Sequence, residues 1–213
     1  MRIGTWNMEG RRGPAQTDLL GAQDCDVWLL TEVPHRWELP GYRMTIGSTD
    51  MALHKRWAVV ASRLTMDEHP SPHPASAIAR VEGVTFVSSI LPWRGCGDRA
   101  PWRGADHAAR MVHALEDLAP ILRGQEHLVW GGDWNQALSG KEYAGSIEGR
   151  QSLLSLVDEL ALSIPTATLP HRVPDLLAID HIAVSGAATS VIRVVAIEGQ
   201  KRLSDHDMYV IEM

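Results

Sequence analysis

Cysteine is scarce in this sequence: Cys25 and Cys96 are the two cysteines among 213 residues, and they form no C-x-x-C pattern. A pair of separated thiols, in a chain long enough to bury a substantial core, excludes a disulfide- or metal-stapled miniprotein. Phenylalanine occurs once and tyrosine three times, whereas tryptophan occurs eight times. We expect buried or incidental thiols in a reducing compartment, which indicates the cytoplasm.

Long apolar runs are also missing. No stretch approaches the roughly 18 residues that are needed to cross a membrane. The first residues, Met1 to Asn7, lead directly into a strand pattern and lack the basic and apolar regions of a signal peptide. We therefore expect a soluble cytoplasmic protein without a membrane span.

Positive charge is not in excess. The chain has 20 Lys and Arg against 26 Asp and Glu, for a formal net charge of −6. This balance excludes a uniformly basic surface for nucleic acid, but it is compatible with a nucleic-acid enzyme that makes local contacts and uses a metal ion. With 45% hydrophobic and 22% charged residues, the composition is ordinary for a globular protein, and the length predicts one domain over residues 1–213.

Short apolar segments dominate the chain. Nine of them predict strands, at 3–8, 27–31, 57–62, 77–81, 84–90, 127–131, 177–184, 191–197 and 208–211. Apolar residues at helical spacing predict helices over 106–119 and 151–161, and a weaker pattern covers 14–22. On the first of these helices we expect His107 and His113 to face solvent. More strands than helices, mixed along the chain, predict an α/β fold in which two mixed sheets form a four-layer sandwich with helices on the outer faces.

Side chains capable of catalysis follow several of the apolar segments. They are Asn7 in T-W-N, Glu32 in L-L-T-E, Asp133 and Asn135 in G-D-W-N, Asp180 in I-D-H, and Asp205 with His206 in S-D-H. Each motif alone is typical of a turn or a helix cap, but together they offer hard oxygen ligands and an imidazole. That combination suits a divalent cation such as Mg²⁺ and acid/base chemistry on a phosphate ester. The sequence has no G-x-x-x-x-G-K-[ST] loop and no H-E-x-x-H, which argues against a P-loop nucleotidase and a zinc protease.

The order of these motifs resembles the endonuclease/exonuclease/phosphatase superfamily, which includes exonuclease III, pancreatic deoxyribonuclease, inositol-polyphosphate 5-phosphatases and bacterial sphingomyelinases. The resemblance runs from residue 5 to residue 206. It implies that Glu32 is the principal ligand of a Mg²⁺ or Mn²⁺ ion. It further implies that Asn7 contacts the metal or the phosphate and that Asp205 supports the metal site.

The resemblance also implies roles for the remaining motif residues. Asp133 would orient and deprotonate the attacking water, and Asn135 would hold the scissile phosphate. His206 would stabilise or protonate the transition state, with its ring oriented by Asp180. These roles agree with general chemistry, in which a carboxylate takes a proton and an oriented imidazole offsets growing charge. Whether Asp133 or His206 is the base stays open at this point.

One position departs from the family pattern. Where family members carry a His or Tyr that reaches the phosphate, this sequence has Ile90, which has no hydrogen-bond donor in its side chain. Arg94 and Arg103 are candidates to replace it, because a guanidinium binds phosphate through two parallel hydrogen bonds. Trp93 and Trp102 lie nearby in the sequence and are candidates to stack on nucleic-acid bases.

Three functions are compatible with the sequence. The first is a metal-dependent nuclease on DNA or RNA, favoured by the Trp and Arg cluster at residues 93–103. The second is a phosphoesterase on a small-molecule or lipid phosphate, favoured by a chain too short for long DNA-grasping loops. The third is a catalytically impaired binding module of the same fold, suggested only by Ile90. We expect the nuclease, with nucleic acid as its substrate, and no protein partner is indicated.

Overall fold

The computed structural model describes residues 1–52 and 54–213, and two large sheets dominate it. The first sheet has the strand order β11-β14-β1-β2-β5-β3, with β4 paired to β5. Its strands are β1 (Arg2–Asn7), β2 (Val27–Pro34), β3 (Arg43–Ile46), β4 (Asp50–Ala52), β5 (Lys55–Ser62), β11 (Ser190–Val194) and β14 (Met208–Glu212). The second sheet has the order β10-β9-β8-β7-β6. Its strands are β6 (Met66–His69), β7 (Ser76–Val81), β8 (Val84–Ser89), β9 (Leu128–Asp133) and β10 (Asp180–Val184).

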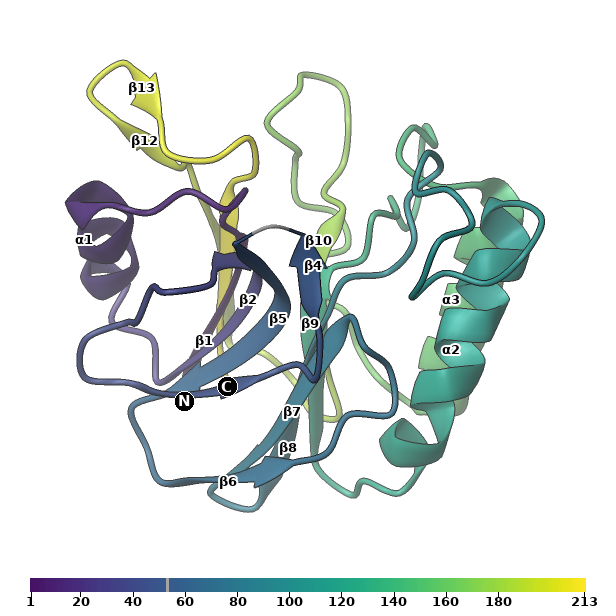
Figure 1. Cartoon of the computed structure of the whole chain (residues 1–213), viewed down its shortest axis with the longest axis horizontal. Coiled ribbons are helices and arrows are strands. Elements are labelled where there is room, and N and C mark those ends of the chain that lie inside the picture. The colour runs from purple at the N-terminus through teal and green to yellow at the C-terminus, as the bar shows by residue number, and fades with distance from the viewer. Residues whose placement is uncertain (53) are drawn as a thin grey trace.

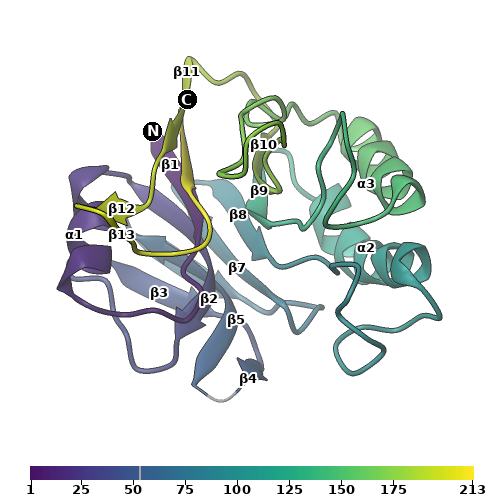
Figure 2. The same cartoon turned by 90° about the horizontal axis from the view of Figure 1, so that it is seen from above.

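Three helices and one small hairpin complete the fold. The helices are α1 (Pro14–Ala22), α2 (His107–Arg123) and α3 (Ile147–Glu159), and the hairpin pairs β12 (Ile197–Glu198) with β13 (Lys201–Arg202). Figures 1 and 2 show α1 on the outer side of the first sheet, and α2 and α3 together on the outer side of the second. The predicted two-sheet α/β sandwich with four layers is therefore confirmed. None of the described helices combines the length and the apolar character that crossing a bilayer requires.

The alternation of side chains along the strands divides the core into layers. On β1, Ile3 packs between the two sheets, whereas Trp6 packs on the opposite face with Leu20 of α1. On β9, Val129 packs between the sheets and Trp130 packs beneath α2 and α3. Because helices or loops cover the outer face of a central strand and the other sheet covers its inner face, most residues of the central strands are buried and apolar. This explains the continuous apolar runs that the sequence shows.

The strands that the sequence pattern did not predict lie at the edges of the sheets. β6 reads M-D-E-H, and only Met66 in it is buried. β4 consists of three residues, none of which is buried. An edge strand is held by backbone hydrogen bonds to one neighbour and needs little apolar burial, so its sequence carries a weak signal. The predicted strand over 177–184 begins only at Asp180.

Candidate active site

Asn7 and Asp133 connect the two sheets. Each is the last residue of its strand and lies on the strand face that points toward the other sheet, the face shared with Ile3 and Val129 respectively. Asn7 Nδ2 donates a hydrogen bond to Asp133 Oδ2 at 2.9 Å and another to Glu32 Oε1 at 3.2 Å. The side chain of Asn7 thus holds two carboxylates that come from different sheets.

Glu32 follows the stretch of β2 that pairs with β1. The parallel pairing of these strands ends with Asn7 opposite Thr31, and Glu32 then adopts a φ of +49°. A positive φ is uncommon for a residue with a side chain and costs backbone energy that the surrounding contacts must offset. The carboxylate is 19% exposed, and Lys55 Nζ lies 2.5 Å from its Oε2. Glu32 is therefore held from one side by an amide and from the other by an ammonium group.

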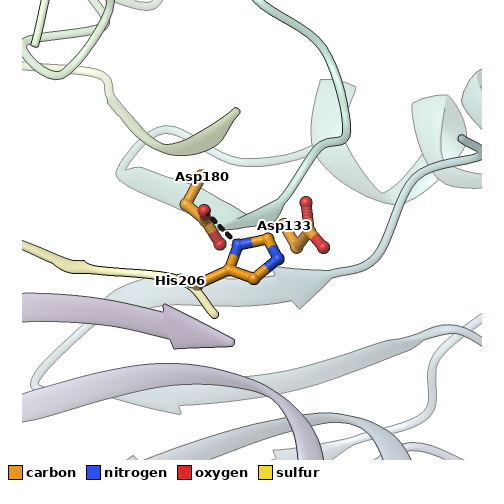
Figure 3. Close-up of side chains that lie close together, drawn as sticks. All are labelled: Asp133, Asp180 and His206. Atoms are coloured by element: carbon orange, nitrogen blue, oxygen red, sulfur yellow. Dashed lines mark hydrogen bonds and ion pairs between the residues drawn. The ribbon is translucent and has the colours of Figure 1, made fainter. Parts of the chain in front are cut away.

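Asp180 and His206 form a second contact pair beside Asp133. β9 and β10 are antiparallel, and their register places Asp180 directly opposite Asp133. His206 Nδ1 lies 2.7 Å from Asp180 Oδ2, and Figure 3 shows the imidazole between the two carboxylates. Ligand atoms of these three residues lie within 4.8 Å of one another, a spacing at which they could hold a metal ion. Within the described residues, Asp180 Oδ1 is buried without a hydrogen-bond partner, so the cluster has capacity for a further proton or cation.

The three clustered groups shift one another's protonation. Burial, together with the negative charge of Asp180, raises the pKa of Asp133 to about 7. Burial by itself would lower the pKa of His206, but the carboxylates of Asp180 and Asp133 outweigh it and raise that pKa to about 10. Burial also raises the pKa of Asp180, an effect that His206 opposes. Near neutral pH the cluster therefore contains a proton acceptor, Asp133, beside a protonated imidazole.

Asn135 is fixed close to Asp133. Its backbone N–H donates to Asp133 Oδ1 at 3.0 Å, and its Nδ2 donates to the carbonyl oxygen of Leu91 at 3.1 Å. Like Glu32, it has a φ of +49°. The G-D-W-N motif therefore ties the backbone of Asn135 to the Asp133 carboxylate, while its side-chain amide contacts Leu91.

The segment around Asp205 is tied to the first strand. Ser204 Oγ donates to the backbone oxygen of Asn7 at 2.7 Å and accepts a hydrogen bond from the N–H of His206 at 3.0 Å. The Asp205 side chain is 48% exposed, and its Oδ1 lies 3.8 Å from His206 Nε2. The sequence does not predict this role for Ser204, the first residue of S-D-H, because its partner on β1 is fixed only by the fold.

The proposed replacements for the missing phosphate donor have other partners here. Ile90 is buried in the core between the sheets. Arg94 is exposed, and its Nε donates to the carbonyl oxygen of Gly145 at 2.9 Å. The guanidinium of Arg103 contacts Asp117 of α2 at 2.8 Å. Trp102 is 2% exposed and packs in the core, so it offers no free face to a base.

The expectation for His107 was wrong, although His113 is exposed as expected. His107 is 6% exposed, and its Nε2 and Nδ1 lie 2.9 Å from the oxygen of Pro92 and from Ser146 Oγ. It is the first residue of α2, where the loop before the helix and the N-terminal end of α3 cover it. A helical wheel gives no information about such a loop. His181 is also buried, on the face of β10 opposite to Asp180, where its Nε2 lies 3.0 Å from a backbone oxygen.

The fold and the site together define a class of protein: an α/β-sandwich hydrolase of the nuclease and phosphatase type. The chain belongs to the Endonuclease/Exonuclease/phosphatase family, whose family model matches residues 4–206. No curated protein sequence matches the chain significantly.

Solved structures provide further similarity at the level of the fold. A 3'-5' exonuclease, NExo, from Neisseria meningitidis is 20% identical with a TM-score of 0.71, over 100% of this chain and 99% of that one. An AP endonuclease from Archaeoglobus fulgidus is 14% identical with a TM-score of 0.72, over 99% and 98%. The endonuclease domain of TRAS1, a telomere-specific non-LTR retrotransposon, is 14% identical with a TM-score of 0.70, over 100% and 97%. These similarities support the two-sheet fold.

Proposed function

We propose that this protein is a Mg²⁺- or Mn²⁺-dependent nuclease, which hydrolyses a phosphodiester of DNA or RNA by in-line attack of an activated water. The observation that carries this proposal is the cluster of Asp133, Asp180 and His206, in which an acceptor and a donor of protons lie side by side. Nucleic acid as the substrate is supported by the similar structures, one of which is a 3' phosphatase, NExo, bound to product DNA hairpin.

The protonation states favour one assignment of acid and base. A general base is most effective when its pKa lies near the working pH, and the pKa of Asp133 is raised to about 7. The pKa of His206 is raised to about 10, so its imidazole is protonated at neutral pH and suits the stabilisation of negative charge. Asp133 is therefore the base that deprotonates water, and His206 is the acid or electrostatic partner. Asp180 positions the His206 ring through Nδ1.

The environment of Glu32 fits a divalent cation. Carboxylate oxygens are the hard donors that Mg²⁺ and Mn²⁺ prefer, and Glu32 already has a positive group at 2.5 Å, the Lys55 ammonium. Glu32 is the principal ligand in this proposal, Asn7 holds its carboxylate through Nδ2, and Asp205 supplies a further carboxylate from the exposed edge. When bound, the cation offsets negative charge on the phosphoryl oxygens.

Two residues are proposed to contact the phosphate directly. Asn135 lies beside Asp133 and is positioned by the backbone contact to it. Arg94 uses Nε for a backbone oxygen, and the described residues give no partner to its two terminal nitrogens, which leaves them for an anion. Arg103 is a weaker candidate, because its guanidinium already pairs with Asp117.

An activity screen tests this function. The protein is incubated with Mg²⁺ or Mn²⁺ and with single-stranded DNA, duplex DNA, abasic DNA, RNA or small phosphodiesters, and Glu32→Ala and Asp133→Asn serve as controls. We expect metal-dependent cleavage of a nucleic acid that both variants lose. Cleavage confined to small phosphodiesters would establish the alternative phosphoesterase. No cleavage of any substrate, combined with retained binding, would point to the impaired binding module.

A further inference from the structure

Lys55 lies at the carboxylate that the proposed metal site requires. It is the first residue of β5, and the antiparallel register places it opposite Pro34, two residues beyond Glu32. Its Nζ lies 2.5 Å from Glu32 Oε2, while Glu32 Oε1 accepts the hydrogen bond from Asn7. The ammonium group and the amide therefore engage both oxygens of this carboxylate.

The backbone of the β1–α1 turn is shaped around the lysine. Gly10 has a φ of +67°, and a Cβ at this position would lie 2.4 Å from Lys55 Cδ. The N–H of Gly10 donates to the backbone oxygen of Glu32 at 2.8 Å. A residue with a side chain at Gly10 would displace the methylene stem of Lys55. The same turn thus accommodates the lysine and fixes the backbone of the glutamate, and the ion pair that results is only partly exposed, at 28% for Lys55 and 19% for Glu32.

Lys55 neutralises part of the negative charge around Glu32 in the metal-free protein. Asn7 brings Glu32 and the buried Asp133 together, so two carboxylates face one another across a single amide group. A buried or half-buried carboxylate without a positive partner is costly, and Lys55 supplies that partner. A divalent cation at Glu32 would bring the same charge compensation, but it would repel an ammonium group at the same oxygen.

We propose that Lys55 is the resident counter-ion of Glu32 and that a divalent cation binds by displacing it, so that metal binding exchanges one cation for another. This inference rests on the metal site of the proposed function. Space for the displaced side chain exists next to it. A groove of about 390 Å³ is lined by Gly10 and His54, which flank Lys55, and by Arg12, Pro34, His35 and Arg36.

Calorimetric titration with Mn²⁺ tests the exchange without measuring activity. Lys55→Met removes the competing charge, and we expect it to bind Mn²⁺ about fivefold more tightly, the equilibrium equivalent of about 1 kcal/mol for a partly exposed ion pair. Lys55→Gln keeps a hydrogen-bond donor to Glu32 and guards against misfolding, and it should show the same direction of change. Lys201→Met is the matched control, since it removes an exposed lysine that forms no ion pair in the described chain, and its Mn²⁺ affinity should equal that of the wild type.

Thermal unfolding gives a second readout. Without metal, Lys55→Met should melt at a lower temperature than the wild type, because Glu32 has lost its counter-ion, and saturating Mn²⁺ should remove this difference. Unchanged or weaker Mn²⁺ binding in both Lys55 variants, with binding still lost in Glu32→Gln, would overturn the exchange and leave the metal site intact. Equal Mn²⁺ binding by the wild type and Glu32→Gln would overturn the metal site of the proposed function and the exchange together.

Discussion

Replacing Asp133 by asparagine is expected to stabilise the metal-free protein while it abolishes activity. The pKa of Asp133 is raised by burial and by Asp180 from 3.8 to about 7. Each pKa unit corresponds to about 1.4 kcal/mol. Above pH 7 the ionised Asp133 therefore lowers the free energy of unfolding of the wild type by about 4 kcal/mol. The penalty is absent in Asp133→Asn, since its side chain cannot ionise.

The substitution also has a cost. The Asn7 amide donates to Asp133 Oδ2 and the Asn135 backbone donates to Oδ1, so an asparagine amide at this position must face one donor with another. One lost hydrogen bond with an unsatisfied donor costs about 1–2 kcal/mol. The net gain is about 2 kcal/mol at pH 8, which for a chain of this size raises Tm by about 5 °C.

The pH dependence of the stability difference between Asp133→Asn and the wild type distinguishes this electrostatic explanation from a simple change in packing. The folded-state pKa of Asp133 lies above the unfolded value, so the carboxyl group destabilises the wild type progressively as pH rises from about 4 to about 7. Differential scanning calorimetry in EDTA should find Asp133→Asn more stable than the wild type at pH 8 and less stable at pH 4. Asp67→Asn, which changes an exposed carboxylate on β6, should differ little from the wild type at either pH. If Asp133→Asn were destabilised equally at both pH values, the electrostatic reasoning would be refuted.

Three further predictions concern the same site. His206→Gln and Asp180→Asn should each lower kcat by about 10² or more, and the double variant should lose little beyond either single one, because the pair acts as a unit; multiplicative losses in steady-state kinetics would contradict this. The rate should rise with pH through about 7, as Asp133 loses its proton, and should fall only near pH 10, where His206 loses its proton. A pH–rate profile that falls above pH 7 would reverse the assignment of acid and base. Gly132→Ala should destabilise the protein by about 3 kcal/mol, because the φ of Gly132 is +123° and a Cβ there would lie 2.2 Å from a backbone oxygen of β8. A chemical denaturation midpoint equal to that of the wild type would show that β8 and β9 can move apart.

The elements that carry the site were predictable because they are buried on both faces. Buried, largely apolar segments lead up to Asn7, Glu32 and Asp133, and strand alternation is sufficient to place Asn7 and Asp133 between the sheets. The same rule explains why His181 and its neighbour Asp180 point to opposite faces.

Other features depend on pairing between distant segments, which local sequence does not encode. Lys55 meets Glu32 only through the register of β2 against β5. Arg103 was a phosphate candidate by its position in the chain, but the folded loop brings it to Asp117 on α2. His107 is buried because the loop before α2 and the N-terminal end of α3 cover it, and the periodicity of α2 alone does not encode that contact.

The hydrogen bond from Asn7 to Asp133 places the proposed active site at the interface between the two sheets of the sandwich. The proposed base, Asp133, lies on one sheet, and the Asn7 amide that donates to it lies on the other. Sliding of the sheets by an ångström would break the alignment while leaving each sheet intact. Catalytic activity should therefore depend on how the two sheets pack against each other. Heat inactivation should coincide with separation of the sheets rather than with the earlier fraying of edge strands such as β4 and β6.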